Sequence, residues 1–338
     1  METLVVALAL AAPMAALNND GNAGTRVGEM HGETKKKYSC FDAASWATHF
    51  KAGNGWRKFS QGYQDSVLHS LFHQSNLGTH NKQYVEFGFH TNDVEGTGPG
   101  SANHRRVVGR HPMSIAELSS AGANSELLQR QGWSGVRFDG DEEDRAKVPN
   151  MHKAFLTPFN VVHVFRAHNV TTEVDYVSID IDSCDLWIFL ALTDTYRPAV
   201  VSVEYQANYF FNESITNVCV RPQDPSNRAF FGTNKFTKGH WGYSASLVAL
   251  AKAGAKRGYT LVWVEPLLDV FFVRNDLLCR QADGRPSAWQ LTEANYGFAT
   301  GLNLHAGRFP AKHDLSMLAK EFVSDGRELL DAWTVKYE

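Results

Sequence analysis

The feature that most constrains the fold is the stretch Val174–Trp187, which reads VDYVSIDIDSCDLW. Its first half is apolar and rich in β-branched residues, which is typical of a strand that is buried on both faces. Such strands belong to parallel sheets covered by helices on each side. Asp180, within the predicted strand, and Asp182 lie at its carboxyl end, where sheets of this type bind ligands. Asp185 precedes an apolar run and is expected to be a helix N-cap.

The rest of the chain alternates between strand-like and helix-like patterns. Strands are expected at 84–89, 135–139, 153–157, 174–180, 199–205, 259–265 and 270–274, and helices at 64–73, 125–131, 159–168, 186–192 and 244–257. The last two strands should form a hairpin around Pro266. This alternation predicts an α/β fold with a Rossmann-like, doubly wound and mostly parallel seven-stranded sheet.

Both ends of the chain differ in composition from this central part. Residues 1–17 contain an apolar run followed by small residues, which is typical of a signal peptide and indicates the secretory pathway. An uncleaved short anchor or a disordered terminus would also fit this pattern, because the segment before the apolar run has no Lys or Arg. Residues 18–37 are rich in Asn, Gly, Thr and Lys and are interpreted as a linker. The α/β domain is expected over 38–278, and residues 279–338 as a helical extension packed on it, with the best helical pattern at 316–330.

The composition excludes several classes of protein. With 338 residues, 43% of them hydrophobic, the chain can bury a large core. A formal net charge of −3 argues against binding of nucleic acid through its phosphate backbone. No apolar stretch reaches the ~20 residues that span a bilayer. The four cysteines permit two disulfides but include no Cys-x-x-Cys pair, so a structural zinc site is not expected.

Three acids, Glu86, Asp139 and Asp180, lie at or near the ends of predicted strands, and they indicate a cofactor that contains a nucleoside. Glu86 is followed by Gly88, where the backbone can approach a ligand closely, and an acid such as Asp139 can bind both ribose hydroxyls. The loop after the first strand lacks the further glycines of a pyrophosphate-binding motif, so a cofactor without phosphates fits better. The candidate cofactor-binding residues are Glu86, Gly88, His90, Asn92, Asp139 and Asp180.

Several short motifs, in this order and spacing, resemble those of one known family. They are SQGYQD at 60–65, VEFG at 85–88, NSELL at 124–128, GWSG at 132–135, SIDID at 178–182, VSVEY at 201–205 and FFVRNDLL at 271–278. Together they resemble the FkbM-type methyltransferases, which are class I, S-adenosylmethionine-dependent O-methyltransferase-like proteins. The resemblance implies a class I methyltransferase fold, S-adenosylmethionine as cofactor, and a hydroxyl of a small molecule or sugar as acceptor.

The resemblance also assigns roles to individual residues. Glu86 and Gly88 match the first cofactor motif of the family, and Asp139 matches the acid expected at the ribose. Asp180 and Asp182 match the acidic motif that lies beside the transferred methyl group.

Methyl transfer to a hydroxyl requires positioning of the acceptor and a base to remove its proton. His152 and Asp182 are the candidate bases, although His152 could equally be an ordinary surface histidine. Glu204 ends the fifth strand, where the family has an acid. His240 and Trp241 could line the acceptor pocket, or could be a packed Trp beside an exposed His. This interpretation requires no metal.

Two other interpretations remain open. Asp180 and Asp182 form an Asp-x-Asp pair, which secretory glycosyltransferases use to hold a divalent metal and a nucleotide sugar. The chain also departs from the family pattern at Ser183 and Cys184, and by an insertion at about 94–121. These departures favour a non-catalytic interaction module on a methyltransferase fold, since a fold does not by itself determine function.

Overall fold

The structure, a computed structural model, describes residues 40–51, 56, 58–60, 63–88, 123–140, 150–181, 184–206, 214–217, 244–265, 268–288 and 319–321. The chain divides into residues 1–39 and 40–338, and all described residues belong to the second unit. Outside the described residues lie the predicted signal peptide, linker and insertion, and the candidate site residues His90, Asn92, Asp182, His240 and Trp241.

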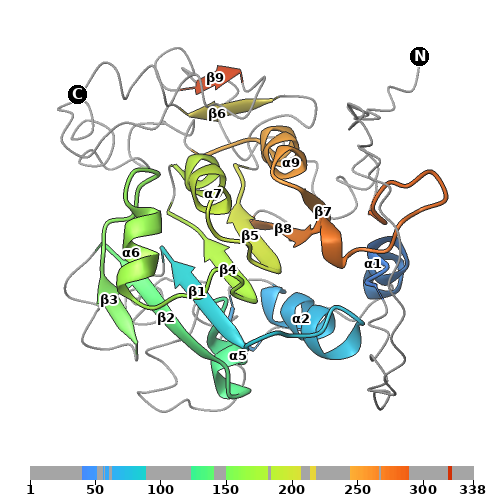
Figure 1. Cartoon of the computed structure of the whole chain (residues 1–338), viewed down its shortest axis with the longest axis horizontal. Helices are drawn as coiled ribbons and strands as arrows, with labels where there is room; N and C mark the ends of the chain where they lie inside the picture. The colour runs from blue at the N-terminus through green and yellow to red at the C-terminus, as the bar shows by residue number, and fades with distance from the viewer. Residues whose placement is uncertain are drawn as a thin grey trace, which may run out of the picture. The chain divides into compact units, whose positions relative to one another are not determined.

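The centre of the fold is a seven-stranded sheet in the order β3-β2-β1-β4-β5-β8-β7 (Figure 1). Its strands are β1 (Gln83–Phe87), β2 (Ser134–Asp139), β3 (Met151–Lys153), β4 (Tyr176–Ile179), β5 (Val200–Glu204), β7 (Tyr259–Val264) and β8 (Asp269–Arg274). The neighbouring pairs from β3 to β5 are parallel, and β8 runs antiparallel to both β5 and β7. The predicted α/β class and the mostly parallel seven-stranded sheet are therefore confirmed.

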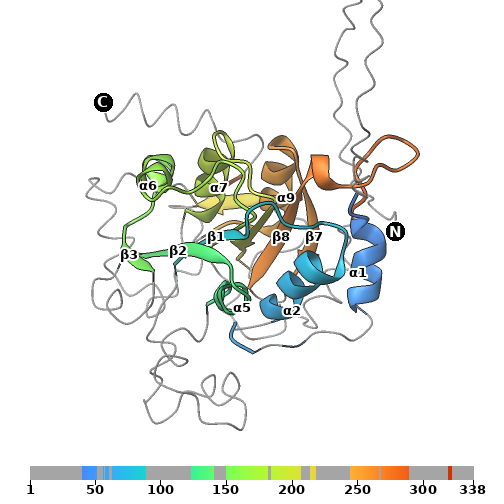
Figure 2. The same cartoon turned by 60° about the horizontal axis from the view of Figure 1, so that its bottom comes forward.

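Helices cover both faces of this sheet (Figure 2). One face packs against α6 (Val161–Ala167), α7 (Asp185–Thr193) and α9 (Leu247–Lys256). The other face packs against α1 (Ala43–Lys51), α2 (Gln64–His69), the π-helical turn η1 (Ser70–Gln74) and α5 (Glu126–Arg130). A short 3₁₀ turn, η4 (Asn275–Leu277), follows β8.

The alternation of side chains along each strand divides the core between these two faces. In β1, Val85 and Phe87 belong to the cluster beneath α6, α7 and α9, whereas Tyr84 belongs to the cluster on the other side. Helix α7 is buried along almost its whole length, as its continuous apolar sequence predicts. The N-cap of helix α9 is Ser246, whose side chain accepts a hydrogen bond from the Ala249 N–H.

Three predicted boundaries next to the site differ from the structure. Strand β4 ends at Ile179, so Asp180 lies just beyond the strand and not within it. Asp185 is the first residue of α7 and not its N-cap, which is Cys184. The third strand covers 151–153 and not 153–157, because pairing with β2 begins at Met151 opposite Arg137. Boundaries depend on such pairing partners, which local sequence patterns do not report.

A second, two-stranded sheet was missed in the sequence. Strand β6 (Ile215–Asn217) pairs antiparallel with β9 (Ala319–Glu321). The helix predicted over 316–330 is therefore wrong at 319–321, where the chain is extended. A three-residue strand whose partner lies about a hundred positions away leaves no local periodicity to detect.

A disulfide between Cys40 and Cys279 joins the segment before α1 to the region after β8. Next to it, Phe41 and Leu278 form an isolated parallel bridge. Cys184 is also disulfide-bonded. Among the described residues, no helix combines the length and apolar character needed to cross a bilayer.

Candidate functional site

The topological switch point of the sheet lies between β1 and β4. From β1 the chain proceeds outward through β2 to β3, and then returns to β4 and continues to β5 on the other side. Ligands of open α/β sheets bind at this point, outside the carboxyl ends of the strands. The candidate site is therefore the edge where β1 and β4 end, with β2 and β5 beside them.

The backbones of Gly88 and Asp180 touch at the switch point. Gly88 follows β1 with φ +86°, and a Cβ added there would lie 1.0 Å from the Asp180 carbonyl oxygen. The Asp180 N–H donates to the Phe87 carbonyl at 3.3 Å. Glycine is thus required here by contact with the neighbouring strand, in addition to any role in binding a ligand.

Three carboxylates gather beside this contact. One oxygen each of Asp180, Asp185 and Glu204 lies within 4.8 Å of the others. Asp185 is fully buried and accepts a hydrogen bond from the Ile181 N–H at 2.7 Å, while Asp180 and Glu204 are half-buried. Negative charges this close repel one another, so the group favours a shared proton or a bound cation. An all-oxygen donor set suits Mg²⁺, Mn²⁺ or Ca²⁺.

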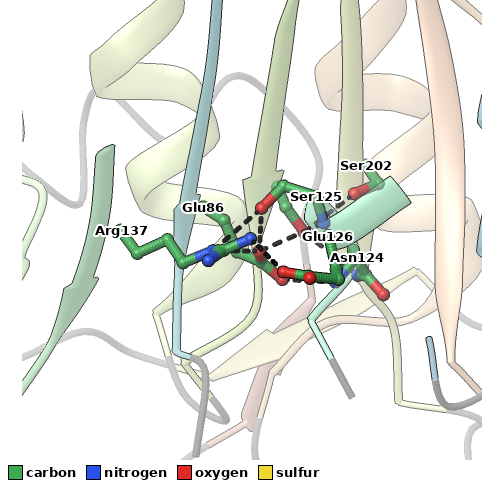
Figure 3. Close-up of polar contacts among 7 residues, drawn as sticks. Glu86, Asn124, Ser125, Glu126, Arg137 and Ser202 are labelled. Atoms are coloured by element: carbon green, nitrogen blue, oxygen red, sulfur yellow. Dashed lines mark hydrogen bonds and ion pairs between the residues drawn. The ribbon is translucent and has the colours of Figure 1, made fainter. Parts of the chain in front are cut away.

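The carboxylate of Glu86 forms hydrogen bonds with other residues of the protein (Figure 3). It is 4% exposed, and Oε1 accepts a hydrogen bond from the Asn124 N–H at 2.6 Å. Oε2 accepts from the Ser125 N–H at 3.1 Å and also from the Ser125 hydroxyl. Glu86 therefore holds the segment that leads into α5, and its effect on a ligand at the switch point is indirect.

Arg137 completes this buried group and was not identified from the sequence. It lies opposite Glu86 in the register of β1 and β2, and its side chain is fully buried. Its Nε donates to the Ser125 hydroxyl at 3.1 Å, and its Nη2 pairs with Glu126 at 3.1 Å. A charged residue inside a strand that is otherwise apolar was the signal, since a buried cation needs an acid on the adjacent element.

Two further buried acids come from the β7–β8 hairpin. The Asp269 carboxylate accepts hydrogen bonds from the side-chain amides of Gln64, at 3.0 Å, and Asn124, at 3.1 Å. Glu265 accepts from the Tyr63 N–H at 2.8 Å. Burial raises the pKa of Asp269 to about 6 and that of Glu265 to about 7. These acids were missed because only the tertiary fold brings the hairpin against α2 and the segment before α5.

The two remaining described candidates lie on β2 and on the edge strand β3. Asp139 ends β2, next to β1, and is 7% exposed. His152 lies on β3, where its ring packs 4.5 Å from the ring of His168. The strands β2 and β1 separate β3 from β4, which corresponds to roughly 14 Å at the usual strand spacing. The structure thus brings Asp139 to the edge of the switch point but does not bring His152 to the acids after β4.

The chain has no match among models of known protein families, and a comparison with curated proteins also finds none.

The geometry supports binding of a polar ligand at the carboxyl edge of β2, β1, β4 and β5. Asp139 offers a carboxylate at one end of this edge, and Asp180, Asp185 and Glu204 gather at the other. A divalent cation held by the three acids would lower the pKa of a coordinated hydroxyl, and a carboxylate alone could accept its proton.

Proposed function

We propose that this protein is an S-adenosylmethionine-dependent O-methyltransferase of the FkbM type, acting on a hydroxyl of a small molecule or sugar. The observation that carries the proposal is the position of Gly88, Asp139 and Asp180. Asp139 is the last residue of β2, and Gly88 and Asp180 directly follow β1 and β4, so the three residues lie at the carboxyl ends of three adjacent strands, around the switch point. The strand number and the mostly parallel direction are those expected of a class I methyltransferase.

Each residue at this edge of the sheet would have its own role in cofactor binding or methyl transfer. Asp139 would accept hydrogen bonds from the ribose hydroxyls, and the backbone at Gly88 would lie beneath the cofactor. Asp182 would take the acceptor proton, and Glu204, His240 and Trp241 would contact the acceptor. His152 is a weaker candidate for the base, given its place on β3. S-adenosylmethionine would supply the methyl group, so the protein needs only to position and deprotonate the acceptor.

Calorimetric titration of the full chain with S-adenosylmethionine, and separately with S-adenosylhomocysteine, tests this function. We expect binding of both, and Asp139→Ala should weaken it by about tenfold or more, because it removes a charged hydrogen-bond acceptor. Asp276→Ala is the matched control, since that acid is exposed at the opposite edge of the sheet and should leave affinity unchanged. A folded protein that binds neither compound would overturn the proposal.

A divalent-metal-dependent glycosyltransferase is the second candidate, and the convergence of Asp180, Asp185 and Glu204 favours it. Titration with Mn²⁺ and a nucleotide sugar distinguishes it from the methyltransferase, because only the glycosyltransferase needs both together. A folded chain that binds no cofactor and no nucleotide sugar would instead indicate an interaction module.

We also infer entry into the secretory pathway from residues 1–17. The Cys40–Cys279 disulfide agrees with an oxidising compartment, where such bonds persist. Detection of the full-length chain in the cytosol, with Cys40 and Cys279 reduced, would contradict this inference.

A further inference from the structure

Asn124 connects three strands of the sheet at the switch point. Its side-chain amide nitrogen donates to Asp269 on β8 and to the Ser178 hydroxyl on β4, both at 3.1 Å. Its backbone N–H donates to Glu86 on β1 at 2.6 Å. Asn124 is 6% exposed, so these contacts are made away from solvent.

The contacts of Asn124 continue into a larger buried network. Ser202 on β5 donates to the Ser178 hydroxyl at 3.1 Å, and Tyr176 hydrogen-bonds Ser202 at 2.8 Å. Figure 3 shows Asn124 and Ser125 between Glu86 on one side and Ser202 on the other. The network therefore joins β1, β4, β5 and β8 on the face of the sheet opposite α7.

This arrangement fixes both ends of the connection between β1 and α5. At one end, Gly88 is held by its contact with the Asp180 backbone. At the other end, Glu86 and Asp269 hold Asn124. Hydrogen bonds to carboxylates are stronger than those between neutral groups, and a buried carboxylate left without its donors is strongly disfavoured. The positions of the ends of β1 and β4 therefore depend on the buried hydrogen bonds that Glu86, Asn124 and Asp269 make.

We propose that Asn124 is a positioning residue of the cofactor site, acting through Glu86 and Asp269. The inference rests on the proposed function, because it assigns to Asn124 the placement of the strand ends that would bind S-adenosylmethionine. Groups that contact a ligand must be held within about 0.5 Å of their productive positions, and the residues behind them provide this. Asn124 does so by matching two donors, its amide and its backbone N–H, to two acids from different strands.

The test uses a reciprocal exchange of Asn124 and Asp269. Asn124→Asp places two carboxylates against each other, and we expect S-adenosylmethionine to bind about tenfold more weakly. In the double variant with Asp269→Asn, the amide nitrogen at 269 can donate to the carboxylate at 124, and Ser178 can donate to it as well. The side-chain amide of Gln64, which donates to the same oxygen of Asp269 in the wild type, can turn so that its oxygen accepts from the new amide. The double variant should therefore recover wild-type affinity to within about threefold.

Asp175→Asn is the matched control. Asp175 is also fully buried and accepts hydrogen bonds from the backbone N–H groups of His80, Asn81 and Lys82, but it lies at the opposite edge of the sheet. The Asp175→Asn variant should have a lower melting temperature. Its affinity for S-adenosylmethionine, measured at a temperature at which it is folded, should be unchanged. If Asn124→Asp does not fold, Asn124→Ser removes the amide without adding charge and should still weaken binding.

The outcomes separate the two proposals. A folded wild-type chain that binds no S-adenosylmethionine overturns the proposed function and this inference together. Two other outcomes overturn only the positioning role. In the first, the wild type binds S-adenosylmethionine and the folded Asn124 variant binds it with the same affinity. In the second, the double variant binds S-adenosylmethionine no more tightly than Asn124→Asp alone.

Discussion

At the scale of single residues, the same kind of side chain has different roles at neighbouring strand ends. Glu86 and Asp139 both lie at the ends of strands, and both were predicted to bind the cofactor. Glu86 accepts three hydrogen bonds from Asn124 and Ser125. Its substitution should therefore destabilise the fold as well as the site, which makes Asp139 the better test of cofactor binding.

Gly88→Ala should destabilise the protein by at least ~2 kcal/mol, because it combines a left-handed backbone with a steric overlap. The added Cβ would lie 1.0 Å from the Asp180 carbonyl oxygen, so the ends of β1 and β4 must separate. Denaturant-induced unfolding would measure the loss. Gly132→Ala is the control, since Gly132 has a similar φ of +83° but no atom near its Cβ position, and it should cost only ~1 kcal/mol. Equal losses in both variants would contradict the steric explanation.

At the scale of elements, the β7–β8 hairpin places acids against α2 and the segment before α5. Glu265 accepts from Tyr63, which precedes α2, and Asp269 accepts from Gln64, the first residue of that helix. The hairpin thereby connects one helical layer to the carboxyl edge of the sheet. Both acids are shielded from water, so their charged forms are disfavoured at the pH where free carboxylates ionise.

This burial predicts that stability falls as the pH rises. Glu265 has its pKa raised from 4.5 to about 7 in the folded protein, mainly by desolvation and also by the nearby Asp269. The folded state therefore holds a proton that the unfolded state has released, and this stabilisation is present below the unfolded pKa and lost as the pH rises through the folded one. The loss due to Glu265 should be on the order of 3 kcal/mol.

Glu265→Gln should reduce the dependence of the unfolding free energy on pH between about pH 5 and pH 8, since an amide can still accept from Tyr63 but does not ionise. Asp269, whose pKa is raised in the same direction, would account for the dependence that remains. Chemical denaturation across this range measures the effect, with Glu173→Gln as an exposed control. The interpretation fails if wild type and Glu265→Gln have the same pH profile.

At the scale of the whole described fold, the Cys40–Cys279 disulfide connects positions 239 residues apart. It fixes the beginning of the α1 region to the chain that leaves β8, where Phe41 and Leu278 already pair. Helix α1 packs its aromatic residues on β7, with the rings of Phe50 and Trp263 4.9 Å apart. The disulfide therefore helps to hold α1 against β7, which is the edge strand of the sheet.

Replacing both Cys40 and Cys279 with Ser should lower the free energy of unfolding by about 2–5 kcal/mol, because the unfolded chain gains conformational freedom. Denaturant titration of the double variant under oxidising conditions measures this difference. Adding a reductant to the wild type should lower the free energy of unfolding by at least as much, since the reductant also breaks the disulfide of Cys184. A double variant as stable as the wild type would show that the bond contributes nothing to folding.

The sequence by itself determined the class of fold and the edge of the sheet at which to look for a site. Continuous apolar strands such as β4, and the acids at the end of β2 and directly after β4, are local patterns, and parallel strands place their carboxyl ends together. Strand and helix types are encoded within a few neighbouring residues, so the strands of the main sheet could be predicted.

Only the tertiary structure decided which residues meet. The strand order places Arg137 beside Glu86, brings Glu204 to Asp180 and Asp185, and sets Asp269 against Asn124, although these partners lie far apart in the chain. The strand order also separates His152 from the acids after β4. Residues 319–321 form a strand because they pair with β6. Local periodicity carries no information about contacts between distant segments, because these depend on how whole elements pack.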